Sequence, residues 1–218
     1  YLSDLNSHFS TIGLVGMNEC LLNFAPIKKD IGTRQGKEFA IEILQFMRNK
    51  IADYQEEDKT ILYNLESTPA ESTAYRLAKH DKIRFPDIIT AGTITTPYYT
   101  NSSNLPVNYT DDPWVAIKNQ EDIQTIYSGG TVQHFYLGER ITDWRKTKAF
   151  IKKVMENSKL PYITITPTFS HCMKHGYLIG DTNGICPHCL EEQKEQFMKK
   201  KMKLQAKLDE IKAKNIIS

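Results

Sequence analysis

Three cysteines and a histidine lie close together near the C-terminus, and they constrain the fold more than any other feature of the chain. They form two short pairs, Cys172-Met-Lys-His175 and Cys186-Pro-His-Cys189, with ten residues between the pairs. A gap of two residues lets one turn present two soft ligands to one ion, and the glycine-containing loop can bring the second turn back. The spacing predicts a zinc ribbon over residues 168–190.

We predict four ligands for this ribbon: Cys172, His175, Cys186 and Cys189. Four protein ligands leave no position for water or substrate, so the site would be closed and structural. Either His171 or His188 could replace His175, and the three cysteines could instead bind with a water. A loop of reduced, metal-free cysteines is a further alternative. An iron–sulfur cluster fits less well, because it prefers all-cysteine ligation.

Composition excludes several classes of protein. The 218 residues are 40% hydrophobic, which can support a core, and the net charge of +2 gives no overall bias toward nucleic acid. The sequence contains no apolar run of about eighteen residues, so no membrane span is expected. Four cysteines do not make a disulfide scaffold, and a ribbon needs free thiolates, so we expect a reducing, cytoplasmic compartment. The chain lacks an initiator Met and a signal-peptide pattern, so we expect a fragment.

Helix and strand patterns alternate ahead of the ribbon and predict an α/β fold. Strands are expected over 60–66 and 162–166, and a helix opening at Pro69 follows the first of them. Further helices are expected over 32–58 and 142–158. The apolar face of the 32–58 helix would comprise Phe39, Ile43, Phe46, Met47 and Ile51.

Two other segments complete the organisation of the chain. Residues 92–113 are rich in Gly, Pro and small polar residues, which predicts a long ordered loop. Residues 191–218 carry eight Lys against five Asp or Glu and predict a charged helix. Its thin apolar stripe comprises Phe197, Leu204, Leu208 and Ile211.

The remaining cysteine, Cys20, stands alone in Gly13-Leu-Val-Gly-Met-Asn-Glu-Cys20. Taken by itself, a lone cysteine is expected to be a small buried residue. Apolar neighbours surround it and suit burial: Leu14, Val15, Leu21 and Leu22.

The segment around Cys20 resembles the finger-loop segment of anaerobic (class III) ribonucleoside-triphosphate reductases. Further similar motifs follow in the same order. They are Asn64-Leu-Glu-Ser-Thr-Pro-Ala-Glu71, the polar loop Tyr98–Val107, Ser128-Gly-Gly-Thr-Val-Gln-His134, and Thr166-Pro-Thr-Phe-Ser170 leading into the ribbon. The resemblance spans essentially residues 1–190.

The resemblance implies a particular fold and particular partners. The fold would be a ten-stranded α/β barrel of the glycyl-radical enzyme type, with an appended zinc ribbon and C-terminal helix. Residues 1–167 would be the later portion of the barrel, 168–190 the ribbon, and 191–218 a charged helix leading toward the glycyl-radical segment. The partners would be a radical-SAM iron–sulfur activating enzyme, nucleotide effectors at a separate N-terminal region, and a second copy in a homodimer, with no membrane.

The resemblance also implies a catalytic role for Cys20, at the tip of a loop inside the barrel. A glycyl radical outside this chain would oxidise it to a thiyl radical, which takes the 3′ hydrogen of a ribonucleotide. Loss of the 2′ hydroxyl as water then becomes possible, and reduction gives the deoxyribonucleotide. The S–H bond is weak enough for the hydrogen to be returned at the end.

Two motifs are candidates for nucleotide contact. A helix N-terminus after a strand offers free N–H groups to phosphates, and a Gly-Gly-Thr turn could line the same cavity. The candidate residues are Ser67, Thr68, Ala70, Glu71, Gly129, Gly130 and Thr131. An ordinary capping box and a plain tight turn are the alternatives. Asn101 and Ser102 are implicated only by the resemblance.

One family feature is missing from the sequence. The defining glycine lies in an Arg-Val-x-Gly-Tyr-like motif, and the 218 residues contain none. We therefore expect no turnover from this chain alone. A formate-lyase type of glycyl-radical enzyme is less compatible with the ribbon. The alternative from another class is a zinc-ribbon module that binds protein or nucleic acid through its lysine-rich helix, although such runs are more often solvated faces.

Overall fold

The computed structural model describes residues 8–107, 109–137, 143–167, 169–179, 182 and 185–215. Thr142 and the side chains of His171, Leu208 and Ile211, which the sequence analysis named, lie outside the described part. The chain divides into two compact units: residues 1–135 with 145–165, and residues 136–144 with 166–218.

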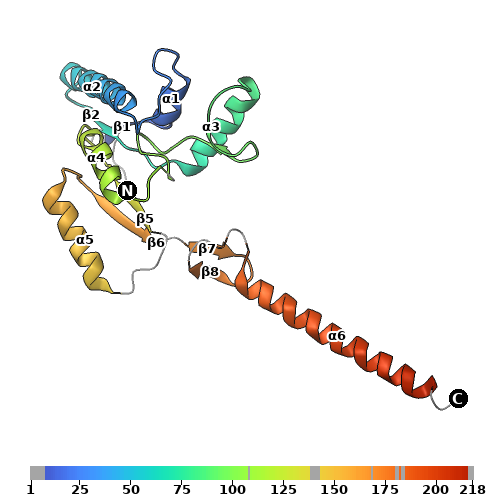
Figure 1. Cartoon of the computed structure of the whole chain (residues 1–218). Coiled ribbons are helices and arrows are strands. Elements are labelled where there is room, and N and C mark those ends of the chain that lie inside the picture. Colours follow the sequence, from blue (N-terminus) through green and yellow to red (C-terminus); the bar gives the residue numbers. More distant parts are fainter. Residues whose placement is uncertain are drawn as a thin grey trace. The chain divides into compact units, whose positions relative to one another are not determined.

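A parallel strand pair organises the first unit (Figure 1). Strand β1 (Phe9–Gly13) pairs with β2 (Leu62–Glu66), with Phe9 beside Leu62 and Gly13 beside Glu66. The connection between them contains α1 (Met17–Asn23) and α2 (Arg34–Glu57). Parallel strands need such a crossover, and it brings both carboxyl ends to one edge of the pair.

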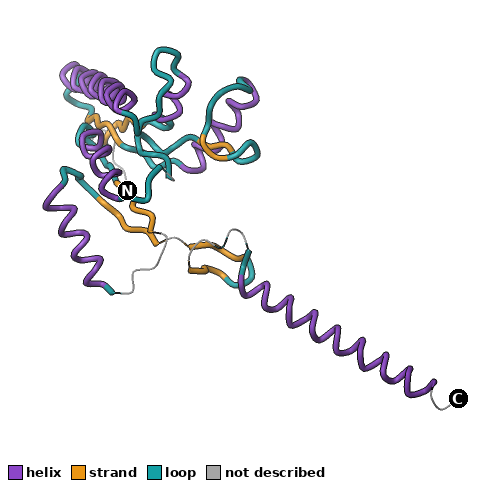
Figure 2. Tube along the Cα trace, in the orientation of Figure 1, coloured by secondary structure: helices purple, strands orange, loops and turns teal. Residues whose placement is uncertain are grey.

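Further short elements follow β2, and Figure 2 separates them by type. They are α3 (Glu71–Arg84), the antiparallel pair β3 (Ala91–Gly92) and β4 (Pro97–Tyr98), and α4 (Pro113–Gln124). Strand β5 (Gln133–Leu137) pairs with β6 (Ile163–Pro167), and α5 (Trp144–Asn157) lies between them in the sequence. The described part is thus mixed α/β.

Two apolar clusters form the core of the first unit. The larger one gathers residues of α1, α2, β2 and the end of α4: Met17, Leu21, Ile31, Ala40, Leu44, Ile51, Leu65, Ile123, Ile126 and Tyr127. The smaller one joins α4, β5 and α5 through Ile117, Phe135, Val154 and Leu160. Each cluster removes side chains of several elements from water, which stabilises their packing.

The second unit is a hairpin followed by a long helix. Strand β7 (Phe169–Cys172) pairs antiparallel with β8 (Gly176–Ile179), and α6 (Pro187–Asn215) follows. No helix among the described residues is long and apolar enough to cross a membrane.

The structure corrects several expectations about the helices. The face of α2 that is buried comprises Gly36, Ala40, Leu44 and Ile51, whereas the predicted core residue Phe46 is 63% exposed. Small residues on the buried face let the helix lie close to its neighbours, and Phe46 falls on the other side.

Four further elements differ from the expectation. The sequence analysis missed β1 and α1, and it missed α4, although Asp112 caps α4 with its side chain on the Trp114 N–H at 2.8 Å and Pro113 occupies the first turn. Pro69 precedes α3 rather than opening it.

Candidate active site and metal centre

Cys20 lies on α1, directly after the carboxyl end of β1. Gly16 begins this helix with a φ of +78°, and a Cβ there would lie 3.1 Å from Cβ of Tyr99. Only glycine adopts this backbone conformation easily, so the turn depends on it. The backbone N–H of Gly16 donates to Thr100 O and that of Met17 to Ser102 O, which joins α1 to the polar loop after β4.

A buried carboxylate beside Cys20 strengthens this junction. Glu19 is 2% exposed. It accepts hydrogen bonds from the Thr100 N–H at 2.9 Å and the Thr100 hydroxyl at 2.8 Å, and from the Asn18 amide at 3.0 Å. A buried carboxylate is costly without such donors. Glu19 therefore fixes the orientation of α1, a role that the sequence analysis did not detect.

The position of Cys20 itself differs from the expectation. The resemblance implied the tip of a loop in an enclosed site, but the residue lies within a helix and is exposed. The buried residues of this helix are Met17, Asn18, Glu19 and Leu21. Cys20 therefore lies on the outer side of the helix. Of the four apolar neighbours, Leu21 is fully buried and the others are partly buried.

The two candidate nucleotide-contact segments lie side by side. The N–H of Ser67 donates to Gly130 O at 2.8 Å, and the N–H of Gly129 donates to Leu65 O at 2.8 Å. A Cβ on Gly13 would lie 1.9 Å from Oγ1 of Thr68. The ends of β1 and β2 and the 128–131 turn thus meet at one edge, where open α/β sheets bind ligands.

The polar loop supplies the cap of α3. The Asn101 side chain accepts from the Ala70 N–H at 3.3 Å and donates to Glu71 Oε1 at 3.2 Å. Ala70 is the N-cap and makes no side-chain cap of its own. The helix start is therefore not a local capping box, because a side chain thirty-one positions after Ala70 accepts a hydrogen bond from its N–H.

Tyr127 links the polar loop to Ser67 through its hydroxyl. Its hydroxyl lies 3.0 Å from the Ser102 hydroxyl and 2.6 Å from that of Ser103. Burial raises the pKa of Tyr127, and hydrogen bonds with Ser102, Ser103 and Ser67 oppose this. The phenol thus stays neutral and orders the backbone around the edge.

Two buried polar atoms at the same edge lack a partner within the described protein. They are Oδ1 of Asn64 and Oγ1 of Thr131. A Cβ on Gly129 would lie 3.1 Å from the Asn64 amide. Buried polar groups are nearly always satisfied, so these two oxygens are exceptional among the described residues.

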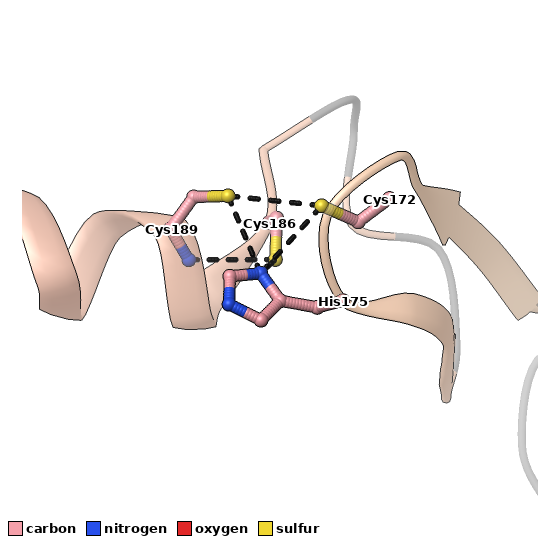
Figure 3. A group of neighbouring side chains, drawn as sticks. All are labelled: Cys172, His175, Cys186 and Cys189. Carbon is pink, nitrogen blue, oxygen red and sulfur yellow. Dashed lines mark hydrogen bonds between the residues drawn. The ribbon is translucent and has the colours of Figure 1, made fainter.

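The second unit brings together all four predicted metal ligands (Figure 3). Cys172 ends β7, His175 lies in the hairpin turn, Cys186 precedes α6, and Cys189 lies in its first turn. Their ligand atoms lie within 4.8 Å of one another. This set could hold a metal ion.

The spacing within the set fits a tetrahedral ion such as zinc. Nδ1 of His175 lies 3.7 Å from the Cys172 sulfur and 3.4 Å from the sulfurs of Cys186 and Cys189. The Cys172 and Cys189 sulfurs are 3.7 Å apart. With Zn–S of about 2.3 Å and Zn–N of about 2.0–2.1 Å, a tetrahedron requires about 3.75 Å between sulfurs and about 3.55 Å from sulfur to nitrogen.

The thiols have opposite tendencies to ionise. The backbone N–H groups of His175 and Lys174 lower the pKa of the Cys172 thiol to about 6. Hydrogen bonding with Cys172 raises the pKa of Cys189 to about 11. Neighbouring like charges disfavour each other, so a second thiolate needs a cation in the cluster.

One carboxylate outside the predicted ligand set contacts the cluster. Glu192, on α6, lies 3.2 Å from Nε2 of His175 and also pairs with Lys174. The Lys174 hydrogen bond lowers the pKa of Glu192. Of the alternative histidine ligands, His188 is exposed, with its ring centroid 5.4 Å from that of His175. No sequence pattern indicated Glu192.

The class of protein is defined by an α/β unit with candidate nucleotide-contact segments at its strand ends, followed by a Cys/His cluster that could hold a metal ion. The family model of anaerobic ribonucleoside-triphosphate reductase matches residues 2–200. The match spans most of the chain, so the chain belongs to this family. Membership also disfavours the interaction-module alternative.

Solved structures show the same fold. An anaerobic ribonucleotide reductase from Thermotoga maritima with MES in the active site aligns with a TM-score of 0.61 at 24% identity, over 85% of this chain and 30% of that one. The structure of the Thermotoga maritima enzyme in complex with dATP and CTP gives 0.62 at 22% identity, with 85% and 30% coverage. The chain therefore spans about a third of these proteins. No curated protein matches it.

Proposed function

We propose that this chain contributes to the radical-based reduction of ribonucleoside triphosphates to deoxyribonucleotides under anaerobic conditions. The observation that carries the proposal is the edge where β1 and β2 end. The Ser67–Glu71 segment meets the 128–131 turn there through a direct hydrogen bond, and Thr68 lies close to Gly13 at the end of β1. The polar loop that contacts Ala70 also hydrogen-bonds the start of the Cys20 helix. Family membership supplies the reaction class.

Cys20 carries the radical step in this proposal. A glycyl radical outside this chain takes the hydrogen of its thiol, and the resulting sulfur radical takes the 3′ hydrogen of the ribonucleotide. The 2′ C–O bond then breaks, and the hydroxyl takes up a proton and leaves as water. An external reductant, formate or a thiol, supplies two electrons, a second proton adds at C2′, and the 3′ hydrogen returns from sulfur to carbon.

A thiyl radical requires exclusion of water and oxygen, whereas Cys20 is exposed in this chain. We propose that the remaining strands of a ten-stranded barrel cover it in the complete protein. The length of the similar structures, of which this chain covers about 30%, supports that arrangement.

The nucleotide contacts divide by chemistry. Gly130 leaves room for a ligand near the backbone, and the Thr68 hydroxyl can donate to phosphate oxygens. Gly129 packs against Asn64 and Thr131 Oγ1 is buried, so these two residues would shape the turn behind the ligand. The Glu71 carboxylate would repel phosphate, so it suits the ribose hydroxyls. The Ala70 N–H is already donated to Asn101, so Ala70 contributes mainly a small side chain at the helix start. Ser67 is buried, so it would hold the 128–131 turn in place through its N–H rather than contact the ligand.

We assign Zn²⁺ to Cys172, His175, Cys186 and Cys189, as a structural centre. Three sulfurs and one nitrogen at tetrahedral spacing support this choice over an iron–sulfur cluster, which prefers cysteine alone. The ion would link the β7–β8 hairpin to α6. That linkage would position whatever follows α6, including a glycyl-radical segment.

The complete protein would work with partners. We propose activation by a radical-SAM iron–sulfur enzyme, regulation by nucleotide effectors outside this chain, and a homodimer. The similar structure with dATP and CTP supports nucleotide binding in general. Free thiolates in the metal centre suit the reducing cytoplasm.

The reaction is tested by assaying the complete protein anaerobically, after activation, with ribonucleoside mono-, di- and triphosphates. We expect deoxyribonucleotide from the triphosphate. Gly130→Ala should raise KM more than it lowers kcat, because its added methyl would obstruct the approach of the nucleotide. Absence of any deoxyribonucleotide product from the activated protein would reject the proposed function.

A further inference from the structure

Glu192 makes two contacts that join the two halves of the metal centre. It lies on α6, one turn beyond Cys189, and faces two consecutive residues of the hairpin turn. One oxygen lies 3.2 Å from Nε2 of His175, and the other pairs with the ammonium of Lys174. The helix that carries Cys189 is therefore tied to the turn that carries His175.

His175 is the only predicted ligand that has two possible donor atoms. Its Nδ1 faces the three sulfurs, and its Nε2 faces Glu192. Neutral imidazole carries one hydrogen, and the nitrogen that lacks it is the one that can bind a metal. A carboxylate accepts hydrogen bonds and cannot donate them when ionised, so it favours the hydrogen on Nε2 and leaves the Nδ1 lone pair for the ion.

We propose that Glu192 is a positioning residue that fixes His175 in the tautomer and orientation needed to bind metal through Nδ1. Lys174 holds the second oxygen of Glu192 and so limits its rotation. The inference rests on the proposal that this cluster holds a metal.

A plain surface ion pair is the competing explanation. The Lys174 and Glu192 side chains are 61% and 41% exposed, and pairs of that kind contribute little to stability. Such a pair would not influence which nitrogen of His175 binds the ion. The contact to Nε2 is what distinguishes the two explanations.

If Glu192 positions His175, its removal should weaken metal binding. This is measured as the metal affinity of the full chain, purified anaerobically. Zn²⁺ is titrated against a competing chelator for wild type, Glu192→Ala and Glu192→Gln. The alanine variant should bind about 10- to 100-fold more weakly, the range for loss of such a supporting group. The glutamine variant should lose less, because its amide oxygen still accepts a hydrogen bond. Glu191→Gln, an exposed neighbour with the same change of charge, should match wild type.

If Glu192 fixes the tautomer of His175, the hydrogen should be found on Nε2. A ¹⁵N-histidine correlation spectrum of the Zn²⁺-loaded chain should show His175 bound through Nδ1 with its hydrogen on Nε2. Glu192→Ala should shift the Nε2–H signal or lose it by exchange with water. Lys174→Gln should retain this signal and lose no more than a few-fold in affinity.

The outcomes separate the two proposals. A wild-type chain that binds no Zn²⁺ would reject the metal assignment and this inference with it. Normal Zn²⁺ binding by wild type and equal binding by Glu192→Ala would reject only the role of Glu192. Equal damage from Lys174→Gln and Glu192→Ala, with the His175 spectrum unchanged, would mean an ion pair without a positioning role.

Discussion

The two units of this chain hold their structure by different means. The first unit buries apolar side chains from five helices and two strand pairs, together with a carboxyl group, that of Glu19, which accepts three hydrogen bonds. In the second unit, no aliphatic or aromatic side chain described from residue 166 onward is buried. Its hairpin and α6 meet instead at three sulfurs and an imidazole.

The difference indicates where each unit is vulnerable. A unit with a core depends on packing and on buried hydrogen bonds, so core truncations and unsatisfied polar groups should damage it. The second unit shows no apolar core among its described side chains, so it should depend on its metal, because the binding free energy of the ion is also folding free energy. Treatments that damage one unit should therefore spare the other.

The largest effect should come from loss of the metal centre. Cys186→Ser removes a ligand, and structural zinc sites contribute about 10–16 kcal/mol in small peptides. We expect loss of Zn²⁺ and rapid proteolysis between residues 169 and 190, with the first unit intact. Met173→Ser, at an exposed position in the hairpin turn, is the control. Equal protease resistance of the zinc-free and wild-type chains would contradict this account of the second unit.

Truncation of a core side chain should destabilise the first unit and leave the metal centre intact. Leu44 is fully buried in the larger cluster, and Leu44→Ala should cost the first unit about 2–5 kcal/mol in free energy of unfolding. Phe46→Ala, on the exposed side of the same helix, should cost far less. Denaturant titration measures both, and Zn²⁺ content should stay at wild-type level. Similar costs for the two variants would mean that the packing of α2 is wrongly described.

Glu19→Gln tests the buried polar network and should cost about 1–3 kcal/mol, because an amide places a donor among the donors that now face the carboxylate. Urea unfolding measures it, with exposed Glu38→Gln as the control. Turnover of the complete protein should fall as well, since Glu19 orients the Cys20 helix. A variant as stable and active as wild type would exclude this role.

The smallest effect should be electrostatic. The hydrogen bond from Lys37 lowers the pKa of Asp122. A carboxyl whose pKa is lower in the folded state adds stability above its unfolded pKa of about 3.9, and this stability is lost as pH falls through the folded value. Asp122 is 47% exposed, so solvent reduces the effect to about a few tenths of a kcal/mol.

Asp122→Asn measures this contribution by unfolding at several pH values. It should be destabilising near pH 7 and neutral near pH 2. A destabilisation that persists unchanged at the lower pH would point to packing rather than charge.

Regular spacing and local signals made part of this structure predictable. The paired ligands in two-residue gaps predicted the metal cluster, and helical periodicity predicted α2, α5 and α6 within a few residues of their ends. Strands β2 and β6 were likewise predicted from short β-rich runs.

The features that were missed depend on distant residues. Glu19 is buried because the Thr100 loop folds over it, and α3 is capped by Asn101 rather than by its own Ser67 or Thr68. Phe46 fits the helical pattern but is exposed. The other predicted residues of that face of α2 lie in or against the core: Phe39, Ile43, Met47 and Ile51. Glu192 has no distinguishing sequence signal, because its contact with His175 exists only when the hairpin turn lies beside α6.

The role of Cys20 is the central claim. Its most direct test is deoxyribonucleotide formation by the complete, activated protein carrying Cys20→Ser, with the glycyl radical quantified in the same sample. We predict that the radical forms at the wild-type level and that no deoxyribonucleotide appears, because a serine hydroxyl cannot exchange its hydrogen with carbon as a thiol does. Deoxyribonucleotide formation at a wild-type rate would contradict the claim and remove Cys20 from the chemistry.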